Sequence, residues 1–138
     1  MTETKGGEKQ MKKVIVLTMM IIFLWTGLSF AENWIMYYEG SSLQSYFDAD
    51  RVVKSGNGFD YWSRDTFTPE FLGNKYLLQH YQIELRNGEW WIQKMESWYI
   101  DAQGKAGDHY PADSWKRMSW SNKSYGIALL DGLRKYGR

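Results

Sequence analysis

The first candidates for acid–base chemistry in this sequence are two histidines. His80 lies in a long apolar and aromatic stretch, and His109 lies among turn-forming residues. Nucleophilic and general-base catalysis need a nucleophile and an orienting group around the imidazole. The sequence around neither histidine shows such a set. We interpret His80 as a half-buried sheet residue, and the sequence predicts no catalytic residue.

Paired carboxylates are the next candidates. The spacing Asp48-x-Asp50 is compatible with calcium, but the glycine and the distal glutamate of an EF-hand loop are missing. Asp48 also precedes a short helical pattern, where a carboxylate caps backbone N–H groups, and we favour this capping role over metal binding. Asp108 and Asp113 lie in turn-forming sequence. With no phosphate-binding glycine loop and no zinc spacing, we predict no metal, no cofactor and no enzyme activity.

The central feature of the chain is the stretch 76–100. Two runs rich in aromatic and β-branched residues flank Asn87-Gly88, the strongest short-range signal for a two-residue type I′ hairpin turn. This turn fixes the pairing. Leu85 should face Trp90, Ile83 should face Ile92, Tyr81 should face Lys94 and Leu77 should face Trp98.

The other face of this hairpin should pair Glu84 with Trp91, Gln82 with Gln93, His80 with Met95, Leu78 with Ser97 and Tyr76 with Tyr99. Because this face is the less apolar one, we expect it to stay partly exposed. It mixes large rings with neutral polar groups, as recognition surfaces do. The candidate ligand-binding residues are Tyr76, Trp91, Tyr99 and Met95, with burial under another element as the alternative.

The remaining elements predict an α+β domain. Residues 33–39, 43–48 and 59–67 have the composition of strands, residues 69–74 form a loop, and residues 106–121 are mostly irregular. We expect Trp115, Met118 and Trp120 to pack onto the sheet edge. The predicted architecture is an antiparallel sheet of about five to six strands with a C-terminal α-helix packed on one face.

The C-terminal helix is predicted from an apolar stripe. Ser124 is a good N-cap, Gly137 suits the position after the helix, and Gly132 weakens the helix by about 1 kcal/mol relative to alanine. The helix must therefore depend on docking. The stripe consists of Tyr125, Leu129, Leu130, Leu133 and Tyr136.

The N-terminus predicts export. Residues 1–10 have no apolar pattern and are interpreted as an upstream start or a tag. Residues 11–31 resemble a secretory signal peptide, with Lys12 and Lys13, an apolar run, and Ser29-Phe30-Ala31 as the cleavage site. Residues 32–138 then form a single domain. The apolar run is at the short end for a membrane span, so we expect no stable anchor after cleavage.

Composition narrows the functional classes. Residues 32–138 contain 13 Lys and Arg against 14 Asp and Glu, so no basic footprint for nucleic acid is present. The chain has no cysteine, which leaves no disulfide and no site for lipid attachment. Its 21 aromatic residues in this range are a high load, and large rings supply much buried area in a small domain.

The chain carries a series of spaced motifs: Trp34-x-x-Tyr37-Tyr38, Tyr46-x-Asp48 with Val52 and Gly56, the long hairpin, Trp115 to Met118, and Ser124 to Leu130. Together these positions resemble the bacterial surface-adhesin protein E family. The resemblance implies a small exported domain with an antiparallel sheet and a C-terminal helix. In the best-known members it implies adhesion to host matrix and serum proteins.

The chain departs from this family by lacking the lipidated cysteine and a cysteine pair. The pair would fall near Leu85 and Leu133, so the resemblance implies contact between these two leucines. The leading hypothesis is an exported, non-enzymatic, adhesin-E-like domain, periplasmic or secreted, that binds a protein or glycan through aromatic and polar side chains. The alternative is a structural envelope protein that self-associates, for example as a homodimer, through its sheet.

Overall fold

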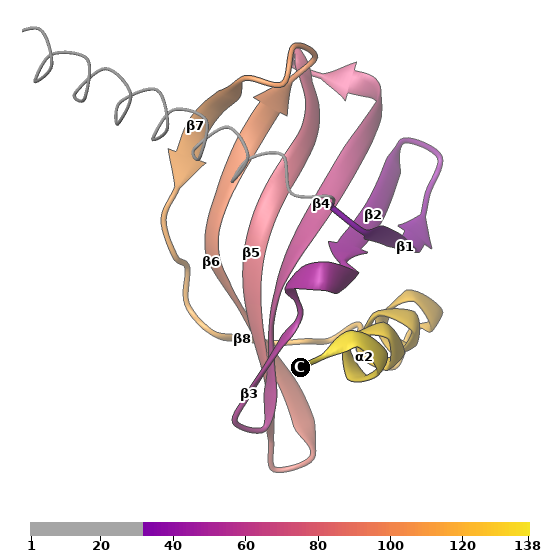
Figure 1. Ribbon diagram of the computed structural model, residues 1–138, viewed down its shortest axis with the longest axis vertical. Helices are drawn as coiled ribbons and strands as arrows, with labels where there is room; N and C mark the ends of the chain where they lie inside the picture. The colour runs from indigo at the N-terminus through magenta and orange to yellow at the C-terminus, as the bar shows by residue number, and fades with distance from the viewer. Residues whose placement is uncertain (1–31) are drawn as a thin grey trace, which may run out of the picture. The chain divides into compact units, whose positions relative to one another are not determined.

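The computed structural model describes residues 32–138, of which residues 33–138 form one compact unit. The predicted tag and signal peptide lie outside the described residues. Within this unit the antiparallel strands follow the order β1-β2-β4-β5-β6-β7, while β3 pairs with β4 and β8 pairs with β6 (Figure 1). The elements are β1 (Trp34–Glu39), β2 (Leu43–Asp48), a 3₁₀ turn η1 (Ala49–Arg51), β3 (Val53–Ser55), β4 (Gly58–Phe71), β5 (Asn74–Arg86), β6 (Glu89–Asp101), β7 (Ala106–Tyr110), β8 (Lys116–Arg117) and α2 (Ser124–Tyr136).

The predicted antiparallel sheet with one C-terminal helix is confirmed, but the described residues contain eight strands rather than five to six. The extra strands β3, β7 and β8 come from segments predicted as loop or irregular chain. Each is five residues or shorter and mostly exposed. Such strands form because a long neighbour offers free N–H and C=O groups at its edge, a signal that short sequence windows do not carry.

The hairpin turn at Asn87-Gly88 is confirmed, with φ of 51° and 78° at the two residues. The predicted pairs hold from Arg86–Glu89 as far as Tyr81–Lys94. There the register shifts, because His80 pairs with Glu96 and leaves Met95 as an extra residue in β6. A β-bulge of this kind moves every later side chain of its strand to the opposite face.

The predicted pairing beyond the bulge was therefore wrong. Leu77 pairs with Tyr99 rather than Trp98, and Tyr76 pairs with Ile100 rather than Tyr99. The turn residues could not reveal this shift, because pairs counted outward from the turn assume that neither strand has an extra residue. No glycine or proline marks the position of this bulge.

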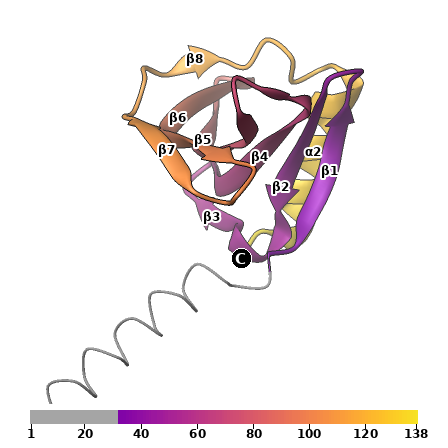
Figure 2. The same cartoon turned by 90° about the horizontal axis from the view of Figure 1, so that it is seen from above.

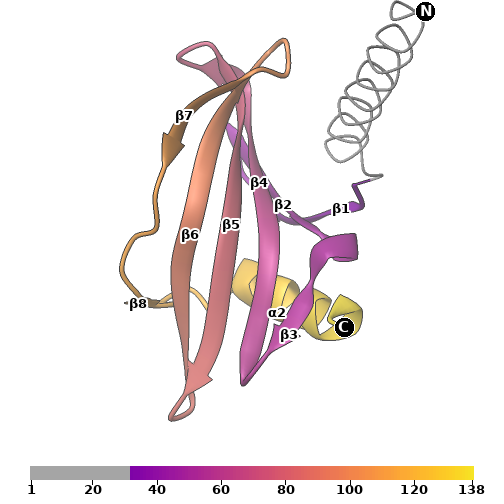
Figure 3. The same cartoon turned by 60° about the vertical axis from the view of Figure 1, so that its left-hand side comes forward.

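The sheet has an inner face, which carries Ile83 and packs against α2, and an outer face, which carries His80. The buried core lies on the inner face and joins side chains of β2, β4 and β5 to the helix. Figure 2 shows the sheet curling between β7 on one side and β1, β2 and α2 on the other, and Figure 3 shows α2 beside the lower half of the long strands. The core consists of Phe47, Ala49, Val52, Phe59, Tyr61, Ile83, Met118, Leu129, Leu130 and Leu133.

The helix follows the predicted stripe, with Leu129 and Leu133 fully buried. One end assignment was wrong, because Lys123, not Ser124, is the N-cap residue and makes no side-chain cap bond. Gly137 follows the helix directly, as predicted, and its N–H donates to Leu133 O, although its φ of −61° lies outside the left-handed region. The chain after the helix also hydrogen-bonds to β3, because Arg138 O accepts from Lys54 N.

The implied pairing of Leu85 with Leu133 does not form a shared core. Leu133 is fully buried, whereas Leu85 is 38% exposed and lies outside the core cluster. The pairing partner of Leu85 is Trp90, and it is Trp90 that packs against the core and lies under Arg134.

The capping role of Asp48 is confirmed. Its Oδ1 accepts the backbone N–H of Asp50 at 3.0 Å and of Asn33 at 3.2 Å, and Arg51 Nε lies 3.1 Å from Oδ2. No helix among the described residues has the length and apolarity to cross a bilayer.

Candidate functional site

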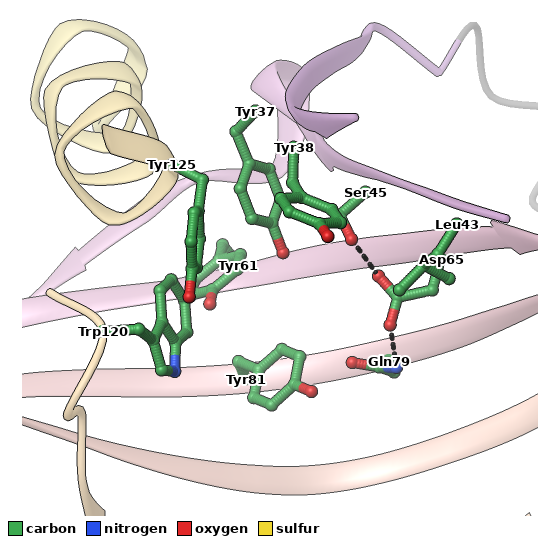
Figure 4. Close-up of a pocket in the computed structure, with 10 residues that line it drawn as sticks. All are labelled: Tyr37, Tyr38, Leu43, Ser45, Tyr61, Asp65, Gln79, Tyr81, Trp120 and Tyr125. Carbon is green, nitrogen blue, oxygen red and sulfur yellow. Dashed lines mark hydrogen bonds between the residues drawn. The ribbon is translucent and has the colours of Figure 1, made fainter. Parts of the chain in front are cut away.

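A cavity of about 360 Å³ opens between the inner face and the start of α2. Figure 4 shows aromatic rings from the sheet and the helix around this space, with Asp65 to one side. The volume falls in the range of small-ligand sites. The lining residues are Tyr37, Tyr38, Leu43, Ser45, Tyr61, Asp65, Gln79, Tyr81, Trp120 and Tyr125.

Two consecutive tyrosines of β1 line the cavity, although alternation would send them to opposite faces. The register of β1 with β2 shifts between Met36 and Tyr38, so Tyr37 is an extra residue. This bulge lets Tyr37 and Tyr38 both face inward. Bulges near sites often redirect a side chain in this way.

Asp65 of β4 is the carboxylate of the cavity. Ser45 Oγ donates to its Oδ1 at 2.7 Å, and Gln79 Nε2 donates to its Oδ2 at 2.9 Å. Both partners are buried and lie on the strands that flank β4. Burial raises the pKa of the Asp65 carboxyl above its usual value, against the opposing effects of the Ser45 and Gln79 hydrogen bonds and the Lys94 charge.

The tyrosine hydroxyls differ in how they are satisfied. Ser63 Oγ donates to the carbonyl of Tyr46 at 3.0 Å, so the Tyr37 hydroxyl, 3.1 Å from the same oxygen, is the donor in that pair. The Tyr61 hydroxyl oxygen is buried and has no hydrogen-bond partner among the described residues. A buried polar atom without a partner costs about 1–3 kcal/mol, so this oxygen requires an explanation.

Tyr37, Tyr61 and Tyr81 of the cavity stay protonated. Burial is the largest cause that raises the pKa of Tyr37, Tyr61 and Tyr81, and the Asp65 charge raises all three further. The rings of Tyr61 and Tyr81 stack at 5.6 Å between centroids. The cavity is therefore lined by neutral rings and hydroxyls around one carboxyl group.

The segment before α2 closes one side of the cavity. Trp120 stacks on Tyr125 with centroids 5.6 Å apart, and Tyr125 meets Tyr38 edge to face at 5.2 Å. Gly126 permits this arrangement, because a Cβ there would lie 2.0 Å from the carbonyl oxygen of Trp120. Only a residue without a side chain lets the helix begin this close to the preceding turn.

The four predicted ligand-binding residues do not form one site. Tyr76 and Trp91 lie on the outer face, as expected. Tyr99 lies on the inner face, because it pairs with Leu77 beyond the bulge, and it packs against Phe67 and Tyr110. Met95 is the bulge residue itself. The single face inferred for all four residues was wrong for the physical reason given above, the extra residue in β6.

The outer face carries stacked rings and cations. The ring of Trp62 stacks on His80 at 4.7 Å and on Trp98 at 5.9 Å, and Trp98 stacks on His109 at 4.6 Å. The guanidinium of Arg64 lies within about 5.4 Å of the ring centres of Trp34, Tyr46 and Tyr76. Trp62, Arg64, His80 and Trp98 are partly buried, and α2, the α-helix of the described residues, packs on the inner face instead.

His80 has carboxylate neighbours that the sequence did not reveal. Its Nε2 lies 2.6 Å from Asp60 Oδ1 and its Nδ1 lies 3.9 Å from Glu96, while His109 lies 3.6 Å from Glu96. The pairing of four strands, β4 to β7, brings these groups together. Among the described residues no hydroxyl hydrogen-bonds to either imidazole, so this cluster has no nucleophile to activate.

None of the residues that line the cavity was predicted from the sequence as a ligand-binding residue. The available signal was Asp65, a charged residue in the middle of a run with Phe59, Tyr61 and Phe67. A carboxylate at a core-facing position of a central strand marks either a buried network or a site. The spacing of Tyr37 and Tyr38 gave no signal, since alternation predicts opposite faces.

In the part of the chain that the structure describes, no group of three or more His, Asp and Glu side chains is placed to hold a metal ion. No model of a protein family matches the chain, no curated protein matches it, and no solved structure matches it. The likeness to the surface-adhesin protein E family therefore stays a prediction from the sequence.

Proposed function

We propose that this protein is an exported, non-enzymatic binding domain and that the cavity under α2 is its ligand site. The observation that carries the proposal is the buried Tyr61 hydroxyl, which has no hydrogen-bond partner in the described residues and lines the aromatic cavity. Buried polar atoms are usually satisfied, so an unsatisfied one in a cavity suggests a group that arrives from outside.

A binding role is favoured over catalysis because of what lines the cavity. Neither histidine nor lysine is among the lining residues, and Ser45, whose hydroxyl could serve as a nucleophile, donates to Asp65. The volume suits a residue-sized group that a protein or glycan carries. The export signal and the adhesin-like pattern agree with a ligand met outside the cytoplasm.

The test compares two matched variants in capture from envelope and matrix extracts. Leu43→Trp adds a ring at the cavity lining, while Trp91→Ala removes a ring from the outer face. If the cavity is the site, a ligand retained by the parent protein is lost with Leu43→Trp and kept with Trp91→Ala, both variants being folded by circular dichroism. Loss with Trp91→Ala alone would place the site on the outer face and overturn the proposal.

Self-association through the outer face is a second candidate function. The stack of Trp62, Trp98 and His109 favours it, because aromatic residues are enriched in protein interfaces. Sedimentation equilibrium separates the two candidates. A tight dimer that Trp98→Ala dissociates, without capture of any ligand, would favour the structural role over the binding role.

A further inference from the structure

The Asp65 carboxylate is arranged as an anion that lacks a paired cation. Each oxygen accepts one hydrogen bond, from Ser45 and from Gln79, and a carboxylate offers about four acceptor positions. No basic side chain of the described residues lies within ion-pair distance of it, whereas carboxylates elsewhere in the described residues pair with Arg51, Arg86, Lys116, Arg117 and Arg134. Burying a carboxylate without a directly paired cation is costly, and Lys94, the one cation that acts on Asp65, does so without forming an ion pair in the described residues.

The aromatic rings of the cavity also lack a cation. Elsewhere in the described residues, Arg64, Arg86 and Arg134 each lie over one or more rings. No lysine or arginine of the described chain lies over a ring of the cavity. The faces of tyrosine and tryptophan rings attract cations, and cages of such rings are used to recognise alkylated ammonium groups.

We propose that the cavity binds a protonated alkylamine, with its ammonium group between the aromatic rings and the Asp65 carboxylate. The inference rests on the proposed function and adds the chemical class of the ligand. Asp65 accepts one ammonium hydrogen in a charge-assisted bond. The Tyr61 hydroxyl oxygen accepts a second, which gives this buried atom its missing partner. The alkyl part lies against the rings and Leu43.

The titratable groups around Asp65 bear on the pH dependence. They are Tyr37 of β1, Tyr61 of β4, Tyr81 of β5 and Lys94 of β6, and of these only Lys94 shifts the pKa of Asp65. The tyrosines are neutral, so Lys94 supplies the competing positive charge. Because burial raises the pKa of Asp65, affinity for the amine should fall with decreasing pH sooner than it would for an exposed aspartate.

The first experiment is calorimetric titration of the purified protein at pH 7.5 with n-butylamine and with its neutral analogue n-butanol. We expect the ammonium form to bind at least ten-fold more tightly than the alcohol. Asp65→Asn should abolish this difference, and Asp131→Asn, on the exposed side of α2, should preserve it. Lys94→Met should tighten amine binding, because it removes the competing cation.

The outcomes separate the inference from the proposed function. Equal affinity for butanol and butylamine overturns the amine and leaves the cavity as an apolar site, and an unchanged difference in Asp65→Asn overturns the pairing of the ammonium with Asp65. Absence of binding by both probes at millimolar concentration overturns the amine as well, and the capture comparison of Leu43→Trp with Trp91→Ala then decides the proposed function. A parallel titration with Nα-acetyl-lysine methylamide distinguishes the sources of the amine, since tighter binding of this compound than of butylamine indicates a lysine side chain and weaker binding indicates a free amine.

Discussion

Gly132 of α2 lies directly against the ring of Phe47 in β2, so close that a Cβ at position 132 would come within 2.5 Å of the ring. Gly132→Ala should therefore destabilise the fold by up to about 2 kcal/mol, because overpacking costs about 1–3 kcal/mol and the gain in helix propensity offsets only about 1 kcal/mol of this cost. Urea unfolding measures the effect. Phe47→Leu in the same chain should relieve part of it, and additive losses in the double variant would contradict this explanation.

The hairpin between β4 and β5 turns through Leu72-Gly73, with φ of 49° at Leu72. This side chain is 84% exposed, so it gains little from packing while holding a left-handed conformation that costs about 1–2 kcal/mol. Leu72→Asn should raise the free energy of unfolding by about 0.5–1 kcal/mol, since asparagine tolerates this conformation. Leu72→Val serves as the opposite control, because a β-branched residue should lower stability at the same position.

Removal of the Tyr61 hydroxyl and removal of the Tyr37 hydroxyl should change the stability of the protein in opposite directions. Tyr61→Phe deletes an unsatisfied buried oxygen and should raise the stability of the unliganded protein by about 1 kcal/mol. Tyr37→Phe deletes the donor to Ser63 and should lower stability by about 1 kcal/mol. Thermal unfolding of both variants tests the pair, and a loss with Tyr61→Phe equal to that with Tyr37→Phe would show that the Tyr61 hydroxyl is satisfied in solution.

The raised pKa of Asp65 predicts a pH-dependent cost to stability. A carboxyl whose pKa is higher in the folded than in the unfolded state favours folding at pH below its ordinary value of 3.8, and this contribution is lost as pH rises through the folded pKa. Asp65→Asn should therefore stabilise the protein at pH 7 and have little effect near pH 3. If the Gln79 side-chain amide rotates by half a turn, its oxygen can accept a hydrogen bond from the new amide N–H at position 65. Melting temperatures of the parent protein and of Asp65→Asn across this pH range measure the effect. If the melting temperature rises equally at pH 3 and pH 7, the charge of Asp65 is not the cause of the stabilisation.

Export predicts a defined N-terminus. Cleavage after Ala31 should leave Glu32 as the first residue of the mature protein, because Ser29-Phe30-Ala31 presents small residues at the positions that signal peptidase reads. Intact-mass spectrometry of protein recovered from a secreting bacterium tests this. An uncleaved chain in the cytoplasm would contradict it, and Ala31→Arg, which blocks the cleavage site, provides the control.

The local chemistry of the sequence determined the elements that short-range rules govern. Asn87-Gly88 specified the hairpin turn because few residues accept positive φ, and the apolar spacing from Tyr125 to Tyr136 specified the buried stripe of the helix. The capping role of Asp48 was also predictable, since a carboxylate placed just before a helical turn accepts the backbone N–H of the residue two positions later. In each case the interacting groups are close in sequence, so the pattern alone was sufficient.

The tertiary structure decided the candidate site, because each of its parts depends on pairing between distant residues. Met95 and Tyr37 became bulges through the fit of whole strands to their neighbours, and these bulges determined which face Tyr99, Tyr37 and Tyr38 occupy. Asp65 acquired its partners from β2 and β5, 20 and 14 residues away. A one-residue shift moves a side chain across the sheet at almost no cost in local propensity, so no local signal in the sequence could have placed these groups in one cavity.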